Sequence, residues 1–437
     1  MSKHGESKLC TTSLRTATKV SEVIEALQSD FVDLGNLKND GAALSVEDKR
    51  FMKILNENKE VVDGHLQLPL PFKSDMAKLP DNKVVAFKRL ESLKSKFNKK
   101  ERFATQYKKF NDCLVDEGQA EAVPEEETAN AGWYLPHHGV YHNHKPGKLR
   151  VVLDCAARYQ GVSLNDVLLQ GPNLMNSLIG VLLRFRKERI AFIGDIKSMF
   201  YQVRVAPQHR DFLRFLWWES GDVNKAPKEF RMLVHVFGAK SSPGCANYSL
   251  KDVAKRLSDK YGQDALEFVQ NNFYVDDGLQ SVETADEAID LIQRTVAMLK
   301  EGGFKLHEFL SNSKQVLKAL PDDCIASNVS QKDLKRTLGI LWDPTLDVFT
   351  FEGNMKENPP TRRGILSTVS AVFDPLGLIG PYILQGKRIL QNVCAEGKDW
   401  DEPLNDDTIQ HWIAWKEELQ YLSNIKISRC YKAPNAT

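Results

Sequence analysis

The order of strand-like and helix-like segments places this chain in the α+β class. Residues 190–196 form an apolar run that is typical of a buried strand. A helix is predicted from Pro243, because proline is tolerated in a first helical turn. The adjacent Asp276 and Asp277, flanked by apolar residues and a glycine, predict a tight turn between two strands. A second helix is predicted from Thr284, so strand, helix, hairpin and helix follow one another.

The composition indicates a globular protein. The chain has 437 residues, 42% of them hydrophobic, which is enough for two or three subdomains that each bury an apolar face. The most apolar region, 379–390, is interrupted by Pro381 and Lys387 and is too short to span a bilayer, so no membrane partner is expected. Seven cysteines include no CxxC pair, which favours reduced thiols and a cytoplasmic setting.

Positive charge is concentrated in one N-terminal stretch. Residues 83–109 hold ten Lys or Arg against two Glu, interleaved with Phe97, Phe103 and Tyr107. Such a stretch is typical of a face that binds a nucleic-acid backbone. It is equally typical of a solvated amphipathic helix whose apolar side lies in a core, and the two interpretations are compatible. The acidic stretch 112–127 is predicted to be a connector.

Further segments complete the pattern on both sides of the predicted hairpin. Strands are predicted at 149–153, 212–218 and 230–237, and a helix is predicted at 173–186. Near the C-terminal end one helix face is apolar, and it is more typical of a core than of a nucleic-acid platform. That face consists of Ile409, Trp412, Trp415, Leu419 and Leu422.

Three carboxylates are the strongest candidates for a functional site. Asp276 and Asp277 at a tight turn can project to one side and hold divalent cations despite their mutual repulsion. Asp195 lies near the end of an apolar strand, where an uncompensated carboxylate is costly to desolvate, so a cation or donor is expected beside it. In nucleotidyl transfer two Mg²⁺ ions, which prefer carboxylate oxygens, stabilise the attacking and leaving oxygens. The alternatives are a plain Asp-Asp-Gly hairpin and an Asp195 that caps the next helix.

Eight short blocks, in a fixed order, carry a resemblance to a known family. They are Tyr134-Leu-Pro-His-His138, Lys148-Leu-Arg-Val-Val-Leu-Asp154, Ser163-Leu-Asn-Asp166, Asp195-Ile-Lys-Ser-Met-Phe200, Phe237-Gly-Ala-Lys-Ser-Ser-Pro243, Tyr274-Val-Asp-Asp277, Leu338-Gly-Ile-Leu-Trp342 and Phe373-Asp-Pro-Leu-Gly377. In this order they resemble the reverse transcriptase region of BEL/Pao-type long-terminal-repeat retrotransposon polyproteins. The resemblance covers nearly the whole chain from about residue 31 onward.

The resemblance implies a right-hand polymerase fold with fingers, palm and thumb, in which the palm has ferredoxin-like topology. It divides the chain into four parts. These are an N-terminal extension at 1–75, a fingers-like region with the basic helix at 76–185, a palm with an inserted fingers hairpin at 186–345, and a thumb- or connection-like helical region at 346–437.

The implied activity is that of an RNA-directed DNA polymerase core. Such an enzyme extends a primer 3′-hydroxyl with dNTPs on an RNA or DNA template. The resemblance implies that Asp195, Asp276 and Asp277 are catalytic and hold two Mg²⁺ ions, or Mn²⁺ in their place. The alternative is a catalytically inactive retroelement remnant, or a host-adopted protein that binds nucleic acid.

The resemblance also assigns a nucleotide pocket. Lys145, Lys148 and Arg150 resemble the fingers hairpin whose basic residues neutralise the incoming triphosphate, and Arg suits phosphate through its bidentate fork. Phe200 falls where the family places the aromatic residue beneath the sugar. Gly238 lies in the block that shapes the pocket around the template and the base. Phe237 stands where retroviral enzymes have Gln, so a polar contact made there is not expected.

Two histidine-containing segments have weaker assignments. His307, or Lys305 near it, falls where related polymerases keep a basic residue that can protonate leaving pyrophosphate. A second segment is rich in histidine but lacks a cysteine or carboxylate at ligand spacing, so a strand-and-turn role is favoured over zinc binding. Its histidines are His137, His138, His142 and His144.

The remainder of the implied polyprotein is expected outside this chain. The sequence contains no Asp-Thr-Gly or Asp-Ser-Gly triplet, so no aspartic peptidase is expected within it. An RNase H domain and an integrase are expected beyond residue 437. The chain is therefore interpreted as a fragment or degraded copy, located in the cytoplasm within a virus-like particle.

Overall fold

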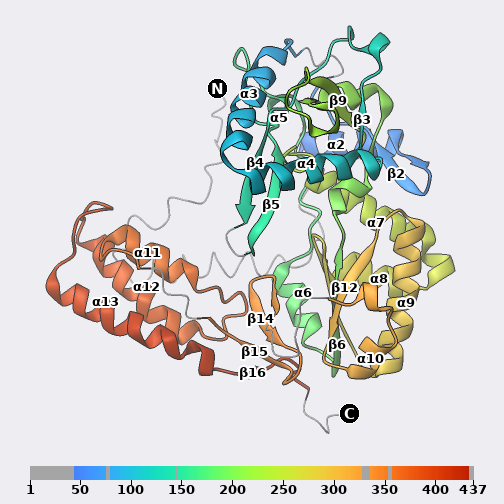
Figure 1. Ribbon diagram of the computed structural model, residues 1–437. Coiled ribbons are helices and arrows are strands. Elements are labelled where there is room, and N and C mark those ends of the chain that lie inside the picture. The colour runs from blue at the N-terminus through green and yellow to red at the C-terminus, as the bar shows by residue number, and fades with distance from the viewer. Residues whose placement is uncertain (1–43, 75–78, 143–144, 327–334, 353–356, 433–437) are drawn as a thin grey trace, which may run out of the picture.

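The computed structural model describes residues 44–74, 79–142, 145–326, 335–352 and 357–432. They form an upper region, a central region around a four-stranded sheet, and a C-terminal region with three long helices (Figure 1). Within the described residues, no helix combines the length and apolarity that a membrane span requires.

The central sheet has the strand order β10-β11-β6-β12, and every neighbouring pair is antiparallel. Along the chain its elements alternate as strand, helices, hairpin, helix and strand, which is the ferredoxin-like arrangement with the first and third strands in the middle. The elements are β6 (Ile190–Ile196), α7 (Ser242–Tyr261), α8 (Gln263–Asn272), β10 (Phe273–Tyr274), β11 (Asp277–Val282), α9 (Ala285–Glu301), β12 (Leu306–Ser311) and the short α10 (Lys314–Lys318). The predicted strand, hairpin and two helices are confirmed.

Each face of this sheet packs against a different set of elements, because side chains alternate along a strand. Phe192 and Ile196 of β6 are buried in one core with α7, α8 and α9. Ala191 and Ile193 point to the other face, in a second core with α6 (Leu178–Phe185) and the hairpin that contains Trp342. Helix α6 is shorter than the predicted 173–186. The predicted capping box at the start of α9 is present, with Thr284 and Glu287 bonded reciprocally.

The upper region surrounds a core rich in aromatic side chains. The basic stretch 83–109 forms two helices, α3 (Lys83–Lys99) and α4 (Glu101–Asp116), which meet at Lys100 in extended backbone. Phe97, Phe103 and Tyr107 are buried in this core, whereas most of the lysines of both helices are exposed. The apolar side of the stretch is therefore structural, and its basic side faces solvent. The remaining elements here are β3 (Ala120–Ala122), β4 (His137–His142), β5 (Lys145–Leu153), α5 (Leu164–Val167), β8 (Arg214–Trp217) and β9 (Lys228–Met232).

The described part of the predicted N-terminal extension packs into the body of the protein. Helix α2 (Val46–Asn58) inserts Phe51, which is fully buried against Gly171 and Gly244. It is followed by the hairpin β1 (Glu60–Val62) and β2 (His65–Leu68), and β2 pairs in parallel with β7 (Arg204–Val205). These contacts attach 44–74 to both the upper and the central regions.

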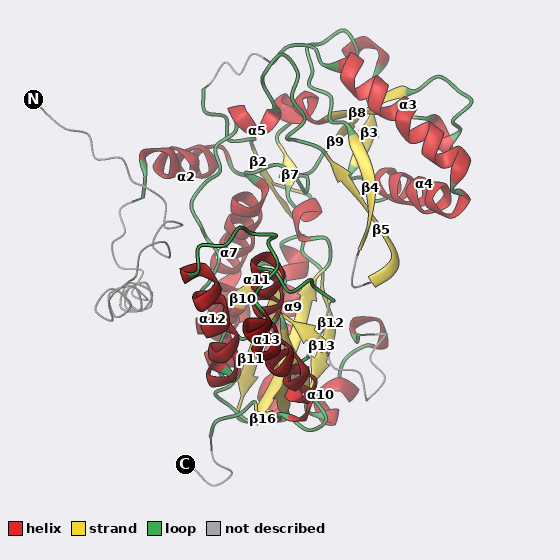
Figure 2. Ribbon diagram, turned by 90° about the vertical axis from the view of Figure 1, so that its left-hand side faces the viewer, coloured by secondary structure: helices red, strands yellow, loops and turns green. Residues whose placement is uncertain are grey.

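The C-terminal region combines a small sheet with three helices. Strands β13 (Lys335–Thr337), β14 (Ile340–Asp343), β15 (Val348–Thr350) and β16 (Ile427–Ser428) form the sheet, and helices α11 (Arg362–Ala371), α12 (Gly380–Ala395) and α13 (Asp406–Glu418) pack together beside it (Figure 2). Trp412, Trp415, Leu419 and Leu422 are buried, which confirms that the predicted apolar face belongs to a core.

The last described strand is fastened to the central region by a buried arginine. Arg429 is fully buried and makes a bidentate ion pair with Asp347. Its guanidinium also donates to the carbonyl oxygens of Phe185, Glu188 and Arg189 at the end of α6. A positive charge is favourable there, because free carbonyls and the helix dipole make a helix C-terminus negative.

Candidate active site at the ends of β6 and β11

The three predicted aspartates lie close together in the fold, where β6 ends and β11 begins. Asp277 of β11 lies directly opposite Asp195 of β6, so the two side chains project from the same face. The backbone oxygen of Asp276 accepts a hydrogen bond from the N–H of Ile196 at 2.9 Å, which ties the hairpin turn to the end of β6. The strand of Asp195 therefore lies beside the Asp-Asp hairpin, which the spacing of the sequence alone did not establish.

His307 extends this row on the other side of Asp195. It is the register partner of Asp195 on β12, and its Nε2 lies 3.5 Å from Asp195 Oδ1. A β-bulge follows at Glu308, which has a φ of 52°. Bulges next to functional sites re-aim a side chain. The row Asp277, Asp195 and His307 therefore comes from three adjacent strands.

The backbone around this row is strained. Val275, the residue before the two aspartates, has a φ of 59°, which is costly for a β-branched residue. Ser198, three residues after Asp195, and Glu308, beside His307, also have positive φ. Strained backbone persists only where the surroundings impose it, and it gathers at functional sites. Each strand end that carries a candidate residue has one such position.

Two glycines lie next to the paired aspartates and allow aromatic rings to pack closely against the opposite face of the sheet. Gly194 and Gly278 are register partners, each adjacent in sequence to one of the paired aspartates. A Cβ on Gly194 would lie 2.8 Å from the ring of Phe309, and one on Gly278 would lie 2.5 Å from the ring of Phe273. Both rings are buried on the face opposite to the carboxylates. This packing of rings against glycines was not predicted from the sequence, although a glycine beside each aspartate indicates a close approach of another group.

The Asp-Asp turn interacts electrostatically with an arginine of the upper region. Burial raises the pKa of Asp276 above its usual value, and the positive charge of Arg150 lowers that pKa in part. Arg150 lies on β5, in the hairpin that extends from the upper region toward the central one (Figure 1). The structure therefore brings predicted nucleotide-binding Arg150 within electrostatic range of predicted catalytic Asp276. The backbone of Lys145 and Lys148 belongs to the same strand, but their side chains lie outside the described part of the chain.

Phe200 and Gly238 occupy adjoining segments. Phe200 follows β6 and its ring meets that of Phe237 edge to face, with centroids 5.5 Å apart. Gly238 has a φ of 116°, and a Cβ there would lie 2.6 Å from the carbonyl oxygen of Leu153 at the end of β5. Asn165 holds this loop, because its amide donates to Gly238 O and accepts from the N–H of Lys240. Asn165 belongs to the block Ser163-Leu-Asn-Asp166, but its role as an anchor of this loop was not predicted.

The donor chemistry of the row fits a hard divalent cation. Mg²⁺ takes carboxylate oxygens, with water and phosphate oxygens completing its shell. Asp195 and Asp277 supply adjacent carboxylates, and Asp276 follows in the same turn. Within the described ranges, no group of three or more His, Cys, Asp or Glu side chains is already arranged around one point to hold a metal ion. Of the four upstream histidines, His137 is buried and bonded to Tyr107, which is a structural role; the side chains of His142 and His144 lie outside the described residues.

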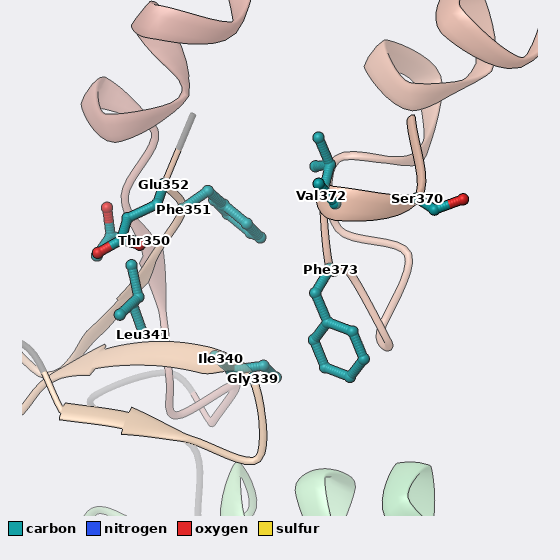
Figure 3. A pocket seen from close by; sticks show the side chains of 10 residues that line it. Gly339, Ile340, Leu341, Thr350, Phe351, Glu352, Ser370, Val372 and Phe373 are labelled. Carbon is teal, nitrogen blue, oxygen red and sulfur yellow. The ribbon is translucent and has the colours of Figure 1, made fainter. Parts of the chain in front are cut away.

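A separate cavity lies in the C-terminal region. It has a volume of about 300 Å³ and lies between the β14–β15 hairpin and the end of α11 (Figure 3). Ile340, Leu341, Phe351 and Phe373 line much of it, with Ser370 and Glu352 as polar neighbours. It is lined by none of the predicted site residues that the structure describes, so the carboxylate row remains the candidate active site.

Comparisons with known proteins support the fold, but they do not support the expectation that an RNase H domain lies only beyond residue 437. Residues 361–437 match the family described as Pao retrotransposon-like RNaseH-like domain. The fold resembles that of a foamy viral protease-reverse transcriptase solved in complex with double-stranded DNA, with a TM-score of 0.50 and 14% sequence identity. The similarity covers 90% of this chain but 60% of the viral one, and at this identity it concerns the fold alone. No curated protein sequence matches. The family match therefore concerns residues 361–437, and the likeness to the viral enzyme concerns the fold of the chain.

Proposed function

We propose that this region is an RNA-directed DNA polymerase core that extends a primer 3′-hydroxyl with dNTPs on an RNA or DNA template. The observation that carries the proposal is the direct pairing of Asp195 with Asp277, beside a strained turn that contains Asp276. The carboxylates of Asp195 and Asp277 project side by side from neighbouring strands, and such oxygens are the ligands that Mg²⁺ prefers. A structural hairpin has no need of this arrangement.

Each residue of the site has a separate task in the proposed reaction. Asp195, Asp276 and Asp277 would hold two Mg²⁺ ions, which when bound stabilise negative charge on the attacking and leaving oxygens. Arg150 would bind phosphate oxygens of the incoming dNTP, because its guanidinium matches phosphate geometry and its charge acts on nearby Asp276. Phe200 would lie against the sugar, and the backbone at Gly238 would approach the base pair closely because no side chain intervenes.

Primer extension by the purified protein tests the proposal. Poly(rA)/oligo(dT) with dTTP and Mg²⁺ or Mn²⁺ should yield extended primers, and Asp195→Asn should yield none. If the wild-type protein binds primer-template but never extends it with either metal, the chain is a non-catalytic binding protein instead.

The exposed basic side of α3 and α4 supports nucleic-acid binding under either outcome. Lys88, Lys96, Lys99, Lys100 and Lys109 are exposed, and within the described ranges none forms an ion pair. Lysines that neutralise phosphates release counterions, so affinity for primer-template should fall steeply as salt rises. A flat plot of log K against log salt would exclude this role.

The C-terminal region is a less suitable place for the chemistry. Residues 361–432, which belong to the RNaseH-like match, form α11–α13 and the two-residue β16. Two of its carboxylates have structural tasks: Asp374 accepts from the N–H groups of Leu378 and Ile379, and Asp401 pairs with Arg363. We therefore assign the proposed activity to the central region.

A further inference from the structure

Helix α4 lies along the β4–β5 hairpin and contacts it at both ends. Four α4 residues face the hairpin, at spacings that place them on one side of a helix. They are Arg102, Phe103, Gln106 and Tyr107. The β4–β5 hairpin carries basic residues toward the candidate active site. Helix α4 supports this hairpin along its length.

The base of the hairpin is held by a buried histidine. His137 Nε2 donates to the carbonyl oxygen of Leu216 at 2.9 Å, so Nδ1 accepts from the hydroxyl of Tyr107 at 2.6 Å. The Tyr107 ring stacks on Trp217 with centroids 5.6 Å apart. The first residue of β4 is therefore fixed between α4 and β8.

The far end of the hairpin is held by Gln106. Its amide Nε2 donates to the carbonyl oxygen of Gly147 at 2.7 Å. Gly147 has a φ of 99°, and a Cβ there would lie 2.7 Å from the guanidinium of Arg102. On the partner strand, a Cβ on Gly139 would lie 2.8 Å from the ring of Phe103. Glycine is therefore required at Gly139 by the close approach of Phe103, and at Gly147 by the positive φ.

Arg150 is three residues beyond Gly147 on the same strand and pairs with Val140. Anything that fixes the backbone at Gly147 therefore limits where Arg150 can stand.

We propose that α4 is the anchor of the hairpin, and that Gln106 is a positioning residue that fixes the strand carrying Arg150 before a nucleotide arrives. The proposal rests on the proposed polymerase function, in which Arg150 binds the triphosphate of the incoming dNTP. The position of the hairpin is then fixed by contacts within the protein before the substrate binds. Such preorganisation lowers the cost of binding, because less freedom is lost when the ligand enters.

The first test is steady-state kinetics of Gln106→Leu, which removes the donor, and of Gln106→Glu, which keeps the shape but replaces the donor with an acceptor. Both should raise the KM for dTTP about tenfold, the size expected for one lost hydrogen bond. The kcat and the primer-template affinity should stay within about twofold of wild type. Thr105→Ala, on the exposed side of the same helix, is the matched control and should change neither constant.

The second test needs no catalysis. Amide hydrogen exchange of peptides covering 145–153 should be faster in Gln106→Leu than in wild type and Thr105→Ala, without nucleotide. Two results would overturn the positioning role. One is an unchanged rate of hydrogen exchange in Gln106→Leu. The other is a rise in KM that is matched by equal decreases in kcat and in primer-template affinity. If hydrogen exchange is faster in Gln106→Leu but the wild-type protein never extends primers, the role of α4 as an anchor is supported and the proposed polymerase function is rejected.

Discussion

Gly194 of β6 and Gly278 of β11 face each other across the central sheet, one position away from the paired Asp195 and Asp277. On the face that carries the glycines, buried aromatic rings occupy the space where side chains would stand. On the other face, the carboxylates lie side by side. The close approach of the rings and the position of the carboxylates are therefore two consequences of one backbone register.

Replacing Gly194 with alanine tests this relationship. The new Cβ would meet the Phe309 ring, so the ring or the strand must shift. We expect a loss of about 1–3 kcal/mol in the free energy of unfolding, measured by urea titration, together with slower primer extension. Gly380→Ala is the matched control, because nothing lies within 4 Å of that position and stability should hardly change. An equal effect of both substitutions would contradict the interpretation.

Neutralising the carboxylates should remove activity while keeping the fold. Asp195→Asn and Asp276→Asn should each lower the extension rate roughly a thousandfold or more, because neutral amides cannot replace charged metal ligands. Their melting temperatures should stay close to wild type. Activity within tenfold of wild type would reject the assignment of these residues as catalytic.

Phe200→Val should change sugar choice if the ring lies against the sugar of the incoming nucleotide. Removing the ring opens space for a 2′-hydroxyl, so use of ribonucleotides should rise relative to deoxynucleotides. Single-nucleotide insertion kinetics with dNTP and rNTP measure this ratio. The ring is half-buried against Phe237 and the central core, so a purely structural role would lower the melting temperature and leave the ratio unchanged.

Arg429 should be among the most important side chains for stability. Arg429→Met leaves Asp347 without its charged partner and three backbone carbonyls without the guanidinium donor, and a loss of about 3 kcal/mol or more is expected. Arg363→Met removes an ion pair with Asp401 in which both side chains are more than 60% exposed. That change should cost about 1 kcal/mol or less. Urea unfolding of the two variants should separate them clearly.

Acid should destabilise the upper region through His137. Burial lowers the pKa of His137 to about 4, below its unfolded value of about 6.5, so the unfolded state takes up a proton first as the pH falls. The stability that His137 contributes is complete above about pH 6.5 and decreases toward pH 4, by about 3 kcal/mol in total. Unfolding free energies at pH 7.5 and 4.5 should differ less in His137→Asn than in wild type. Parallel pH profiles would contradict a neutral buried imidazole.

The sequence by itself determined the elements around the candidate site. The apolar run at 190–196, the Asp-Asp turn and the capping box of Thr284 and Glu287 each depend on residues that are close in the chain. Local periodicity and turn chemistry are sufficient for such elements. The face of Trp412 and Trp415 was predicted correctly for the same reason.

Only the tertiary structure decided which of these elements meet. The pairing of Asp195 with Asp277, the rings of Phe273 and Phe309 behind the glycines, and the support of the β4–β5 hairpin by Gln106 all join segments far apart in the chain. Helix periodicity likewise did not reveal that the basic stretch divides at Lys100. Such contacts depend on register and on which apolar faces bury one another, and this is a property of the whole core rather than of any local window.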